Sequence, residues 1–428
     1  MTSGDSRLYR YLSGAWVPRK LLQALVWLGG ASLNTREQMI REICIEAARW
    51  RHELHRNPQT MYEEEFASNF IGRKLTEWAI PHQNGIAKTG VVATIRGKHD
   101  RSGRAIAFRA DIDALDIQEQ SGQPWASLIP GKMHGCGHDG HTATLLALAH
   151  YLNETRNFDG TVHLVFQPAE EGGRGAFRML QDGLLERFPF DEIYGYHNWP
   201  MMPRGVFAIR SGPMLAAVDD FQIQLTGKGG HAGLPQHTHD IIPAASQLVL
   251  ALQTIVSRET DPLAAAVISV TNFNAGTGAF NVIPGLATLS GTVRTFSASV
   301  RDHIETRMCE ITKNIALSFR LSGQVEYKRL MDATINHPES TAHARAAASS
   351  VVAEENVREF DPVMGGEDFG GFLLKRPGAF MAIGQAEPDS NSPHSQMVHS
   401  PQYDFNDAII PIATSYFAEL AERRLPIV

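Results

Sequence analysis

The segment GKMHGCGHDGHTATLLALAHYL at residues 131–152 concentrates metal-binding side chains in front of an apolar, helical run. His134, His138 and His141 would share one face of a helix, but glycines separate them and favour a loop with close backbone approach. Cys136 and His138 can converge on one ion from such a loop, and a thiolate beside imidazoles suits zinc or another borderline transition metal. The alternative is a glycine-rich turn with an incidental cysteine and capping histidines.

Other short segments place carboxylates and histidines at the predicted ends of strands. FQPAEEGG ends a strand with Glu170 and Glu171, which point to opposite sides of an extended backbone, so one could bind metal and the other act as a general base. GYHNWP places His197 at another strand end, and MVHSPQYDFND places His399 near the C-terminus. Each segment also has an ordinary interpretation, because paired glutamates often lie in solvated loops and lone histidines often fill core or capping positions.

Together, one cysteine, three histidines and one glutamate supply five candidate ligands, whereas a mononuclear site uses three or four. The sequence therefore predicts two divalent ions, about 3.5–4 Å apart, that share a ligand. Zinc, manganese, cobalt and nickel are all compatible, because spacing does not fix the identity of the metal.

The size and composition of the chain limit its class. A chain of 428 residues exceeds one ordinary compact domain, so two domains are expected. The hydrophobic content of 43% and the charged content of 20% fit a soluble globular protein, and a net charge of −7 argues against nucleic-acid binding. The sequence has no run of about 18 apolar residues, so we expect no membrane span.

Residues 1–35 are expected to form an N-terminal extension. An apolar run near residues 21–33 follows basic residues and weakly resembles the core of a signal peptide. However, Cys44, Cys136 and Cys309 are too few and too scattered for a disulfide framework, and they suit a reducing compartment. We therefore expect a cytoplasmic protein with an amphipathic extension rather than an exported one.

Strands and helices alternate along most of the chain, which is typical of an α/β protein. Because such sheets place their sites where strands end, the polar segments should meet at one edge of the sheet. The expected helices cover residues 34–58, 63–80 and 142–153, and the expected strands cover residues 89–98, 105–115, 160–173 with its loop, and 190–200.

The middle of the chain has a different pattern. A strand from residue 218 is followed by a helix over 241–258, strands over 265–276 and 287–296, a helix over 299–319 and a strand over 324–330. This order describes a small α+β domain with a split βαβ pattern. We predict that residues 214–327 are inserted into a catalytic domain formed by residues 36–213 and 328–428.

Nine segments, in this order, resemble one family. They are RADIDAL, MHGCGHDGHTA, FQPAEEGG, HNWP, GKGGHAG, NVIP, GTVRTF, GGEDFGGF and HSPQYDFND, and they extend from about residue 40 to the C-terminal end. The sequence is similar to the aminoacylase, hippurate hydrolase and auxin-conjugate (IAA-amino acid) amidohydrolase family of dinuclear metallopeptidases. The resemblance implies a zinc-peptidase-like α/β catalytic domain with an inserted α+β, ferredoxin-like domain that serves as a lid and in dimerisation.

The resemblance also implies roles for individual residues. Glu170 would take a proton from the attacking water and deliver it to the leaving amine. Asp111 or Asp113 would orient a histidine ligand, with a helix cap or a salt bridge as the alternative for this pair. The implied metal ligands are Cys136 as the bridge, His138, Glu171, His197 and His399.

The inserted domain would contribute to the same site. In the family, the histidine at the position of His231 reaches an active site, often that of the partner subunit, and stabilises the tetrahedral oxyanion. Asn281 would assist substrate binding, and Arg294 would pair with the substrate carboxylate through its guanidinium fork. Without the resemblance, His231 and Arg294 would be interpreted as ordinary surface residues.

Three positions depart from the family pattern. Asp116 replaces a usual proline, Gly366 replaces a frequent serine, and Asp240–Pro243 replaces a more usual Asp-Pro start of the lid helix. None of these changes removes a ligand, so they concern specificity rather than activity. His394 competes with His399 as the C-terminal ligand, but the HSPQYDFND context favours His399.

These observations predict a metal-dependent amidohydrolase that cleaves an N-acyl amino acid into a carboxylate and a free amino acid. Lid closure would exclude water from the charged transition state. The expected partners are two divalent ions per subunit, a small-molecule substrate and further copies of the chain in a dimer or tetramer. A dipeptidase or carboxypeptidase with the same centre is the nearest alternative, and the bridging cysteine favours the amidohydrolase. A non-catalytic binding protein is disfavoured because Glu170 accompanies the full ligand set.

Overall fold

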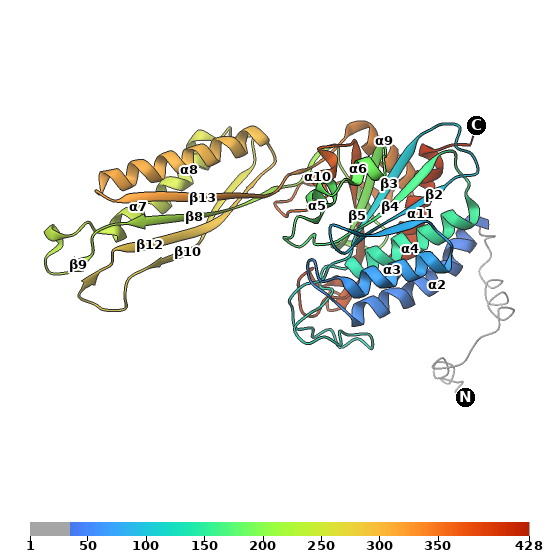
Figure 1. Ribbon diagram of the computed structural model, residues 1–428, viewed down its shortest axis with the longest axis horizontal. Coiled ribbons are helices and arrows are strands. Elements are labelled where there is room, and N and C mark those ends of the chain that lie inside the picture. The colour runs from blue at the N-terminus through green and yellow to red at the C-terminus, as the bar shows by residue number, and fades with distance from the viewer. Residues whose placement is uncertain (1–34, 428) are drawn as a thin grey trace, which may run out of the picture. The chain divides into compact units, whose positions relative to one another are not determined.

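The computed structural model describes residues 35–427 of the chain. The predicted N-terminal extension, with its apolar run near residues 21–33, therefore lies outside the described residues apart from Thr35. Within the described residues the chain forms two main β-sheets, each with its own helices (Figure 1). Strands and helices alternate, which confirms the predicted α/β class.

The larger sheet is mixed and has eight strands in the order β1-β2-β4-β3-β5-β16-β6-β15. Its centre is parallel, because β3 pairs with β4 and β5, and β5 pairs with β16, all in the same direction. The apolar runs of these strands are buried along nearly their whole length, as expected for a sheet that helices cover. The strands are β1 (His82–Ile86), β2 (Gly90–Arg96), β3 (Ala105–Asp111), β4 (Thr161–Gln167), β5 (Glu192–Pro203), β6 (Phe207–Ile209), β15 (Val357–Glu359) and β16 (Gly378–Ala386).

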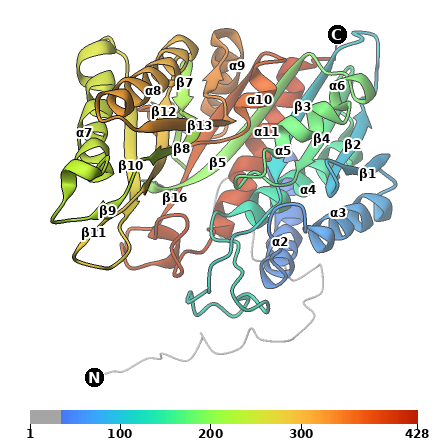
Figure 2. The same cartoon turned by 60° about the vertical axis from the view of Figure 1, so that its left-hand side comes forward.

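Helices pack against this sheet and against each other. α4 (His138–Thr155) packs on β3 and on α11 (Ile410–Arg424), and Figure 2 shows these two helices beside the strands. Nearly every residue of α4 is buried, because the helix has neighbours on all sides. The other helices around the larger sheet are α2 (Thr35–Arg56), α3 (Glu65–Glu77), α5 (Gly175–Gln181), α6 (Leu184–Arg187), α9 (Pro338–Ser349) and α10 (Gly370–Leu373), with short turns η4 (Glu354–Asn356), η5 (Pro393–Ser395) and η6 (Asp407–Ile409).

The second sheet is antiparallel and has four strands in the order β10-β12-β8-β13. Buried and less buried residues alternate along β12, because one face of the sheet packs on α7 and α8 (Figure 1). The chain order β8-α7-β10-β12-α8-β13 is the split βαβ pattern that the sequence predicts. The elements are β8 (Ala217–Thr226), α7 (Ile241–Thr254), the π-helical turn η3 (Ile255–Glu259), β10 (Ala266–Ala275), β12 (Leu286–Thr295), α8 (Ala298–Ser318) and β13 (Ser322–Met331).

Short strands and one turn lie next to the second sheet in sequence. β9 pairs with β11, and β7 pairs with β14, each in a two-stranded antiparallel ladder. Their bounds are β7 (Gly212–Leu215), β9 (Gly230–His231), η2 (Pro235–His237), β11 (Val282–Ile283) and β14 (Thr334–Asn336).

One stretch of the described residues, Ile241–Glu259, is long and apolar enough to cross a membrane by length and composition alone. Its buried side chains, including Ile241, Leu248 and Leu252, belong to the core of the second sheet. This contact explains the apolar composition of α7 as that of a core helix.

The start of α4 differs from the prediction. The helix begins at His138 rather than at residue 142, so His138 and His141 lie in its first turn and not in a loop. Gly137 supplies the left-handed turn before the helix, with φ +92°. Gly140 is helical, and it is glycine because a Cβ there would lie 2.4 Å from the ring of Phe405. The glycines therefore serve one turn and one close packing contact.

Candidate metal centre

The predicted ligands meet where strands of the larger sheet end. Asp111 is the last residue of β3, and Glu170 and Glu171 follow the end of β4. Three overlapping groups each place their ligand atoms within 4.8 Å of one another. These groups are Cys136, His138 and His197; Cys136, Glu171 and His399; and His138, Glu170 and Glu171. Cys136, His138 and Glu171 each belong to two of these groups, and of the three it is Cys136 that joins the group of His197 to the group of His399.

Buried His138 and partly buried His197 are oriented as metal ligands usually are. Nδ1 of His138 lies 3.0 Å from the carbonyl oxygen of Asp113, and Nδ1 of His197 lies 2.7 Å from that of Asn198. Nε2 of His138 is buried and makes no hydrogen bond, and Nε2 of His197 lies 3.3 Å from Sγ of Cys136. A metal-binding imidazole typically donates its other N–H to a carbonyl or carboxylate, so these side chains fit a cation at Nε2.

A second pair brings the C-terminal part of the chain to the centre. Nε2 of His399 lies 3.1 Å from Oε1 of Glu171. His399 has φ +67°, and its backbone N–H donates to the carbonyl of Gly135 at 2.8 Å. The backbone N–H of Glu171 donates to Oδ2 of Asp113 at 2.9 Å. Asp113 therefore contacts both a candidate histidine and a candidate carboxylate ligand.

The charges of the centre favour a cation. Burial and the nearby carboxylates of Glu171, Glu170 and Asp111 raise the pKa of the Cys136 thiol well above its usual range. Burial lowers the pKa of His138, but Asp111 and Asp113 outweigh it and raise that pKa to about 10. Divalent ions would neutralise this excess of carboxylates and deprotonate the thiol. The donor set of thiolate, imidazoles and carboxylates thus fits transition-metal ions.

Glu170 lies in a buried acidic pocket that the sequence did not reveal. Its Oε1 accepts a hydrogen bond from the backbone N–H of Asp368 at 3.3 Å, and it lies within 4.8 Å of Glu367. Arg109 is fully buried and donates to Asp111 at 2.9 Å, to Glu367 at 2.8 Å and to Asp368 at 3.3 Å. Arg109 and Asp111 belong to the segment RADIDAL, and Glu367 and Asp368 belong to GGEDFGGF. The sequence predicted a role for the aspartates of RADIDAL but none for Arg109, Glu367 or Asp368.

The turn between α2 and α3 also contacts the centre and was missed. Oε1 of Glu64 accepts a hydrogen bond from the backbone N–H of Ala169 at 2.9 Å. The hydroxyl of Tyr62 donates to the carbonyl of Gly173 at 2.6 Å. These two contacts hold the loop of Glu170 and Glu171 at a residue before the glutamates and at a residue after them.

His141 and His134 lie near the candidate ligands but differ from them. Nδ1 of His141 lies 2.6 Å from Oδ1 of Asp111, and its Nε2 lies 2.8 Å from Oδ1 of Asn198, so protein atoms satisfy both nitrogens. Burial lowers the pKa of His134 to about 4, which keeps this imidazole neutral. His141 therefore has no free nitrogen for a metal ion, whereas Nδ1 of His134 is buried without a hydrogen-bond partner and His134 belongs to none of the ligand groups.

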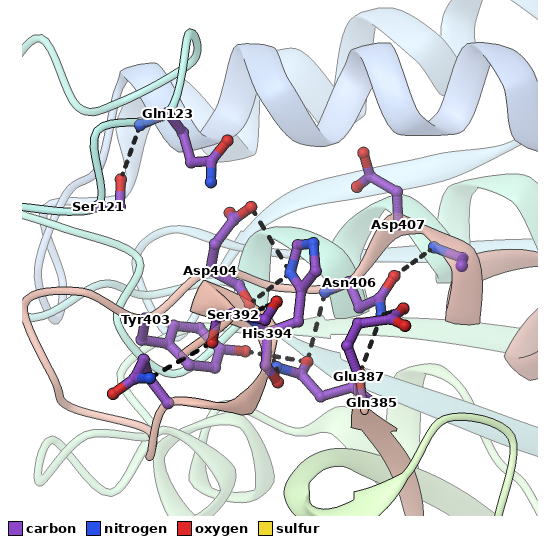
Figure 3. A network of polar contacts seen from close by, with 12 residues as sticks. Ser121, Gln123, Gln385, Glu387, Ser392, His394, Tyr403, Asp404, Asn406 and Asp407 are labelled. Carbon is purple, nitrogen blue, oxygen red and sulfur yellow. Dashed lines mark hydrogen bonds and ion pairs between the residues drawn. The ribbon is translucent and has the colours of Figure 1, made fainter. Parts of the chain in front are cut away.

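His394, the alternative to His399, belongs to a different network. Figure 3 shows His394 beside Asp404, whose carbonyl oxygen lies 3.2 Å from its Nδ1. The carbonyl of His394 accepts from the side chain of Gln385 at 3.0 Å, and Gln385 also contacts Asn406 (Figure 3). The structure thus places His399, and not His394, against the described ligands.

The candidate substrate residues lie on the second sheet and its loops. His231 and Asn281 are exposed neighbours, since Ala232 N–H donates to the carbonyl of Asn281 at 2.9 Å. Within the described residues, no hydrogen bond or ion pair joins either side chain to a candidate ligand. Arg294 is half-buried on β12, and its Nη1 lies 3.6 Å from the position of a Cβ at Gly366. Arg294 thus approaches the GGEDFGGF segment, whereas His231 and Asn281 do not meet the centre.

The three departures from the family pattern have local explanations. A Cβ at Gly366 would lie 2.3 Å from a methyl group of Val218, so a serine would clash there. Asp240 caps α7 by accepting the N–H of Ile242 at 3.0 Å, and Asp116 is exposed 3.6 Å from Lys132. These changes do not disturb the ligand groups.

Comparison with known proteins agrees with this geometry. The model of peptidase family M20/M25/M40 matches residues 107–423. The chain is 38% identical over 377 residues to hippurate hydrolase of Campylobacter jejuni, covering 88% of this chain and 95% of the relative. It is 40% identical over 380 residues to N-acetylcysteine deacetylase of Bacillus subtilis, covering 87% and 94%. A solved structure from Bacillus subtilis, described as a dinuclear metal binding peptidase from the M20 family, superposes with a TM-score of 0.78 at 34% identity, covering 91% of this chain and 100% of the other.

The chain therefore belongs to peptidase family M20/M25/M40. This result confirms the predicted family resemblance, and with it the predicted enzyme class of metal-dependent amidohydrolases. The same comparisons support divalent metal ions as the cofactor.

Proposed function

We propose that this protein is a dinuclear amidohydrolase that cleaves N-acyl amino acids into a carboxylate and a free amino acid. The observation that carries the proposal is that Cys136 joins the ligand group of His197 to that of His399, near the buried carboxylate of Glu170. Relatives named hippurate hydrolase and N-acetylcysteine deacetylase support the substrate class. The proposed metal ligands are Cys136 as the bridge, His138, Glu171, His197 and His399.

Each protein group has a defined task in the proposed reaction. When bound, the divalent ions lower the pKa of water to about 7 and polarise the amide carbonyl. Glu170 accepts a proton from the attacking water and later delivers it to the amide nitrogen, so that the amine leaves neutral. Asp113 lies 3.2 Å from Nδ1 of His138 and accepts the backbone N–H of Glu171, so it orients both ligands, and Asp111 lies 3.5 Å from Nε2 of His138.

The substrate side of the proposal assigns residues 214–327 to a lid inserted between residues 36–213 and 328–428. Arg294 binds the carboxylate of the amino acid, and its position beside the GGEDFGGF segment supports this role. His231 stabilises the tetrahedral oxyanion and Asn281 assists binding after lid closure, from the same or a partner subunit. The exposure of both residues leaves them accessible for such a contact.

Three finer assignments belong to the same proposal. Zinc, manganese, cobalt and nickel all suit the thiolate, imidazole and carboxylate donors. A dimer or tetramer is supported by exposed apolar side chains on the second sheet and its loops, including Leu250, Leu263 and Phe280. Three free cysteines, Cys44, Cys136 and Cys309, support a cytoplasmic location.

The alternative is a dipeptidase or carboxypeptidase, which the peptidase character of the family favours. The test measures free amino acid released from hippurate, N-acetyl amino acids and dipeptides. The chelated enzyme is assayed before and after addition of zinc, manganese, cobalt or nickel. Metal-restored release from N-acyl amino acids is expected. Release from dipeptides alone would establish the alternative, and no release with any metal would overturn the proposal.

A further inference from the structure

The loop that follows β4 has an unusual backbone conformation directly before the two adjacent glutamates. Ala169 has φ +54°, in the left-handed region that residues with a side chain rarely adopt. Ala169 is fully buried, and its carbonyl accepts a hydrogen bond from Gly175 N–H at 3.0 Å. Such a conformation persists only where the surroundings fix it.

Glu64 is the group that fixes Ala169 from outside the loop. Its Oε1 accepts the backbone N–H of Ala169 and that of Tyr62, both at 2.9 Å. Its Oε2 accepts the hydroxyl of Thr89 at 2.5 Å. The residue is fully buried, so these donors replace the water that would otherwise solvate the carboxylate. Hydrogen bonds to a carboxylate are about twice as strong as neutral ones, which makes this a firm attachment.

Tyr62 makes a second attachment to the same loop. Its hydroxyl donates to the carbonyl of Gly173 at 2.6 Å. Glu64 therefore holds the residue before Glu170, and Tyr62 holds a residue just after Glu171. Both attachments come from the turn before α3, so the two glutamates are held relative to this one turn.

We propose that Glu64, assisted by Tyr62, is a positioning residue that sets the directions of Glu170 and Glu171. The inference rests on the proposed roles of these two glutamates as general base and metal ligand. Both carboxylates follow Ala169 in the chain, so a rotation at Ala169 moves them together. Loss of the attachment therefore changes turnover and metal geometry at once, beyond any loss of stability.

The test compares variants of the full-length, metal-loaded enzyme. Glu64→Leu removes the acceptor, and Tyr62→Phe removes only the second attachment. Glu64→Gln keeps an oxygen for both N–H groups, and its amide can donate to Thr89. Glu63→Gln is the matched control, because this neighbouring carboxylate is exposed and pairs with Lys132 at 3.1 Å.

We expect Glu64→Leu to lower kcat about 10- to 100-fold and Tyr62→Phe about tenfold, with KM changed less than about twofold. Glu64→Gln and Glu63→Gln should stay near the wild-type kcat. A purely structural role would lower the melting temperature but leave the kcat of the folded enzyme unchanged.

Two further measurements do not depend on turnover. Amide hydrogen exchange at Ala169 should accelerate in Glu64→Leu and remain slow in Glu64→Gln and Glu63→Gln. The visible spectrum of the cobalt(II)-loaded protein should shift in Glu64→Leu and Tyr62→Phe, because it reports the geometry of the ligands. Glu64→Gln should retain the wild-type spectrum.

The outcomes separate this inference from the proposed function. Wild-type kcat and an unchanged cobalt spectrum in Tyr62→Phe and in folded Glu64→Leu would overturn the inference. If Glu64→Leu does not fold, Tyr62→Phe decides alone. Glu170→Gln is assayed alongside, and full turnover in that variant would overturn the proposed function. Exchange at Ala169 would still report whether Glu64 holds the loop.

Discussion

Two adjacent glutamates with identical side chains have opposite pKa shifts at this centre. Burial, with Glu367 and Glu171 nearby, raises the pKa of Glu170 well above its usual range. Burial also acts on Glu171, but His399 and His138 outweigh it and lower the pKa of that carboxyl. A raised pKa makes the carboxylate of Glu170 a stronger base, which suits acceptance of a proton, and a carboxyl that stays ionised suits a cation. The environments of the two side chains thus match their proposed roles.

Replacement of these two residues should have different effects. Glu170→Gln should lower kcat about 10²- to 10⁴-fold with metal content unchanged, because the amide cannot move a proton. Glu171→Gln should lose bound metal as well as activity. Steady-state kinetics and elemental analysis of the dialysed proteins distinguish the two results. Loss of metal from Glu170→Gln would contradict its assignment as the base.

Cys136 should affect the binding of both ions, because it joins the ligand group of His197 to the ligand group of His399. Cys136→Ser should therefore lower the metal content below one ion per chain and reduce kcat at least 100-fold. Replacement of a residue that only contacts a metal ligand already costs about 10- to 100-fold in metal affinity or activity, and a direct ligand should cost more. Cys309→Ser, at an exposed free cysteine, is the matched control. Retention of two ions by Cys136→Ser would contradict a bridging role.

For single residues, the sequence predicted the candidate metal ligands but not the residues that contact and orient them. The proposed ligands follow from cysteine, histidine and glutamate at strand ends. Arg109 was not predicted, because its partner Glu367 lies 258 residues further along the chain. The role of Glu64 was also missed, because one more glutamate in MYEEEF gives no signal until the fold buries it beside Ala169.

At the scale of elements, a buried charge network joins α2 to the start of α4. Arg51 lies 2.7 Å from Asp404 and 3.4 Å from Asp139, the residue after a candidate ligand. Nδ1 of His55 lies 2.8 Å from Asp139, and its Nε2 lies 3.2 Å from Glu119. The network therefore connects α2, α4 and the C-terminal loop that carries His399.

His55 makes the stability of this packing depend on pH. Burial lowers its pKa, but Asp139 and Glu119 outweigh burial and raise it from 6.5 to about 9. A raised pKa means that the folded state binds one more proton, so the stabilisation is complete below pH 6.5 and is lost as the pH rises through 9. The free energy of unfolding should fall by up to about 1.4 kcal/mol per pH unit in this window. Denaturant titrations at several pH values measure the slope.

His55→Gln provides the comparison for that slope. Glutamine can donate a hydrogen bond to Asp139 but carries no titrating proton. The variant should therefore be less stable below pH 6.5 and should lack the part of the slope that His55 contributes. Equal slopes in the two proteins would exclude His55 as its source.

Secondary structure was predicted best where the pattern was long and periodic. The helix expected over residues 34–58 is α2, Thr35–Arg56, and the helix expected over residues 299–319 is α8, Ala298–Ser318. The start of α4 was wrong because Gly140 was interpreted as a loop residue, whereas it makes room for Phe405. A close contact between distant segments overrode the local preference of glycine.

At the scale of the whole molecule, the metal centre joins segments that are far apart in sequence. Its candidate ligands come from the start of α4, the end of β4, β5 and the loop before α11. A metal ion that binds only the folded chain stabilises it, by about 2.7 kcal/mol at 100 times its Kd. The melting temperature should therefore rise with metal concentration and fall after chelation.

Calorimetry of the chelated and the reloaded protein measures this shift. Cys136→Ser should show a much smaller shift than the wild-type protein, and Cys309→Ser should show the full shift. An identical shift in all three proteins would mean that the stabilising ion binds elsewhere.

Within the described residues, the order of the elements of the second sheet was predicted from the alternation of strands and helices after residue 214. The sequence could not predict that β7 and β14 pair at the points where the chain enters and leaves the second sheet. That pairing joins Gly212–Leu215 to Thr334–Asn336, and it depends on the complete fold rather than on any local pattern.

The buried thiol of Cys136 has a consequence for the reactivity of the metal-free chain. Thiolates are the form that oxidants attack, and neighbouring carboxylates keep this sulfur protonated in the metal-free chain. A cation held by this ligand set would displace that proton, and the thiolate would then donate its electron pair to the metal. Burial and the same acidic surroundings that favour a cation thus make the metal-free sulfur less reactive toward oxidants.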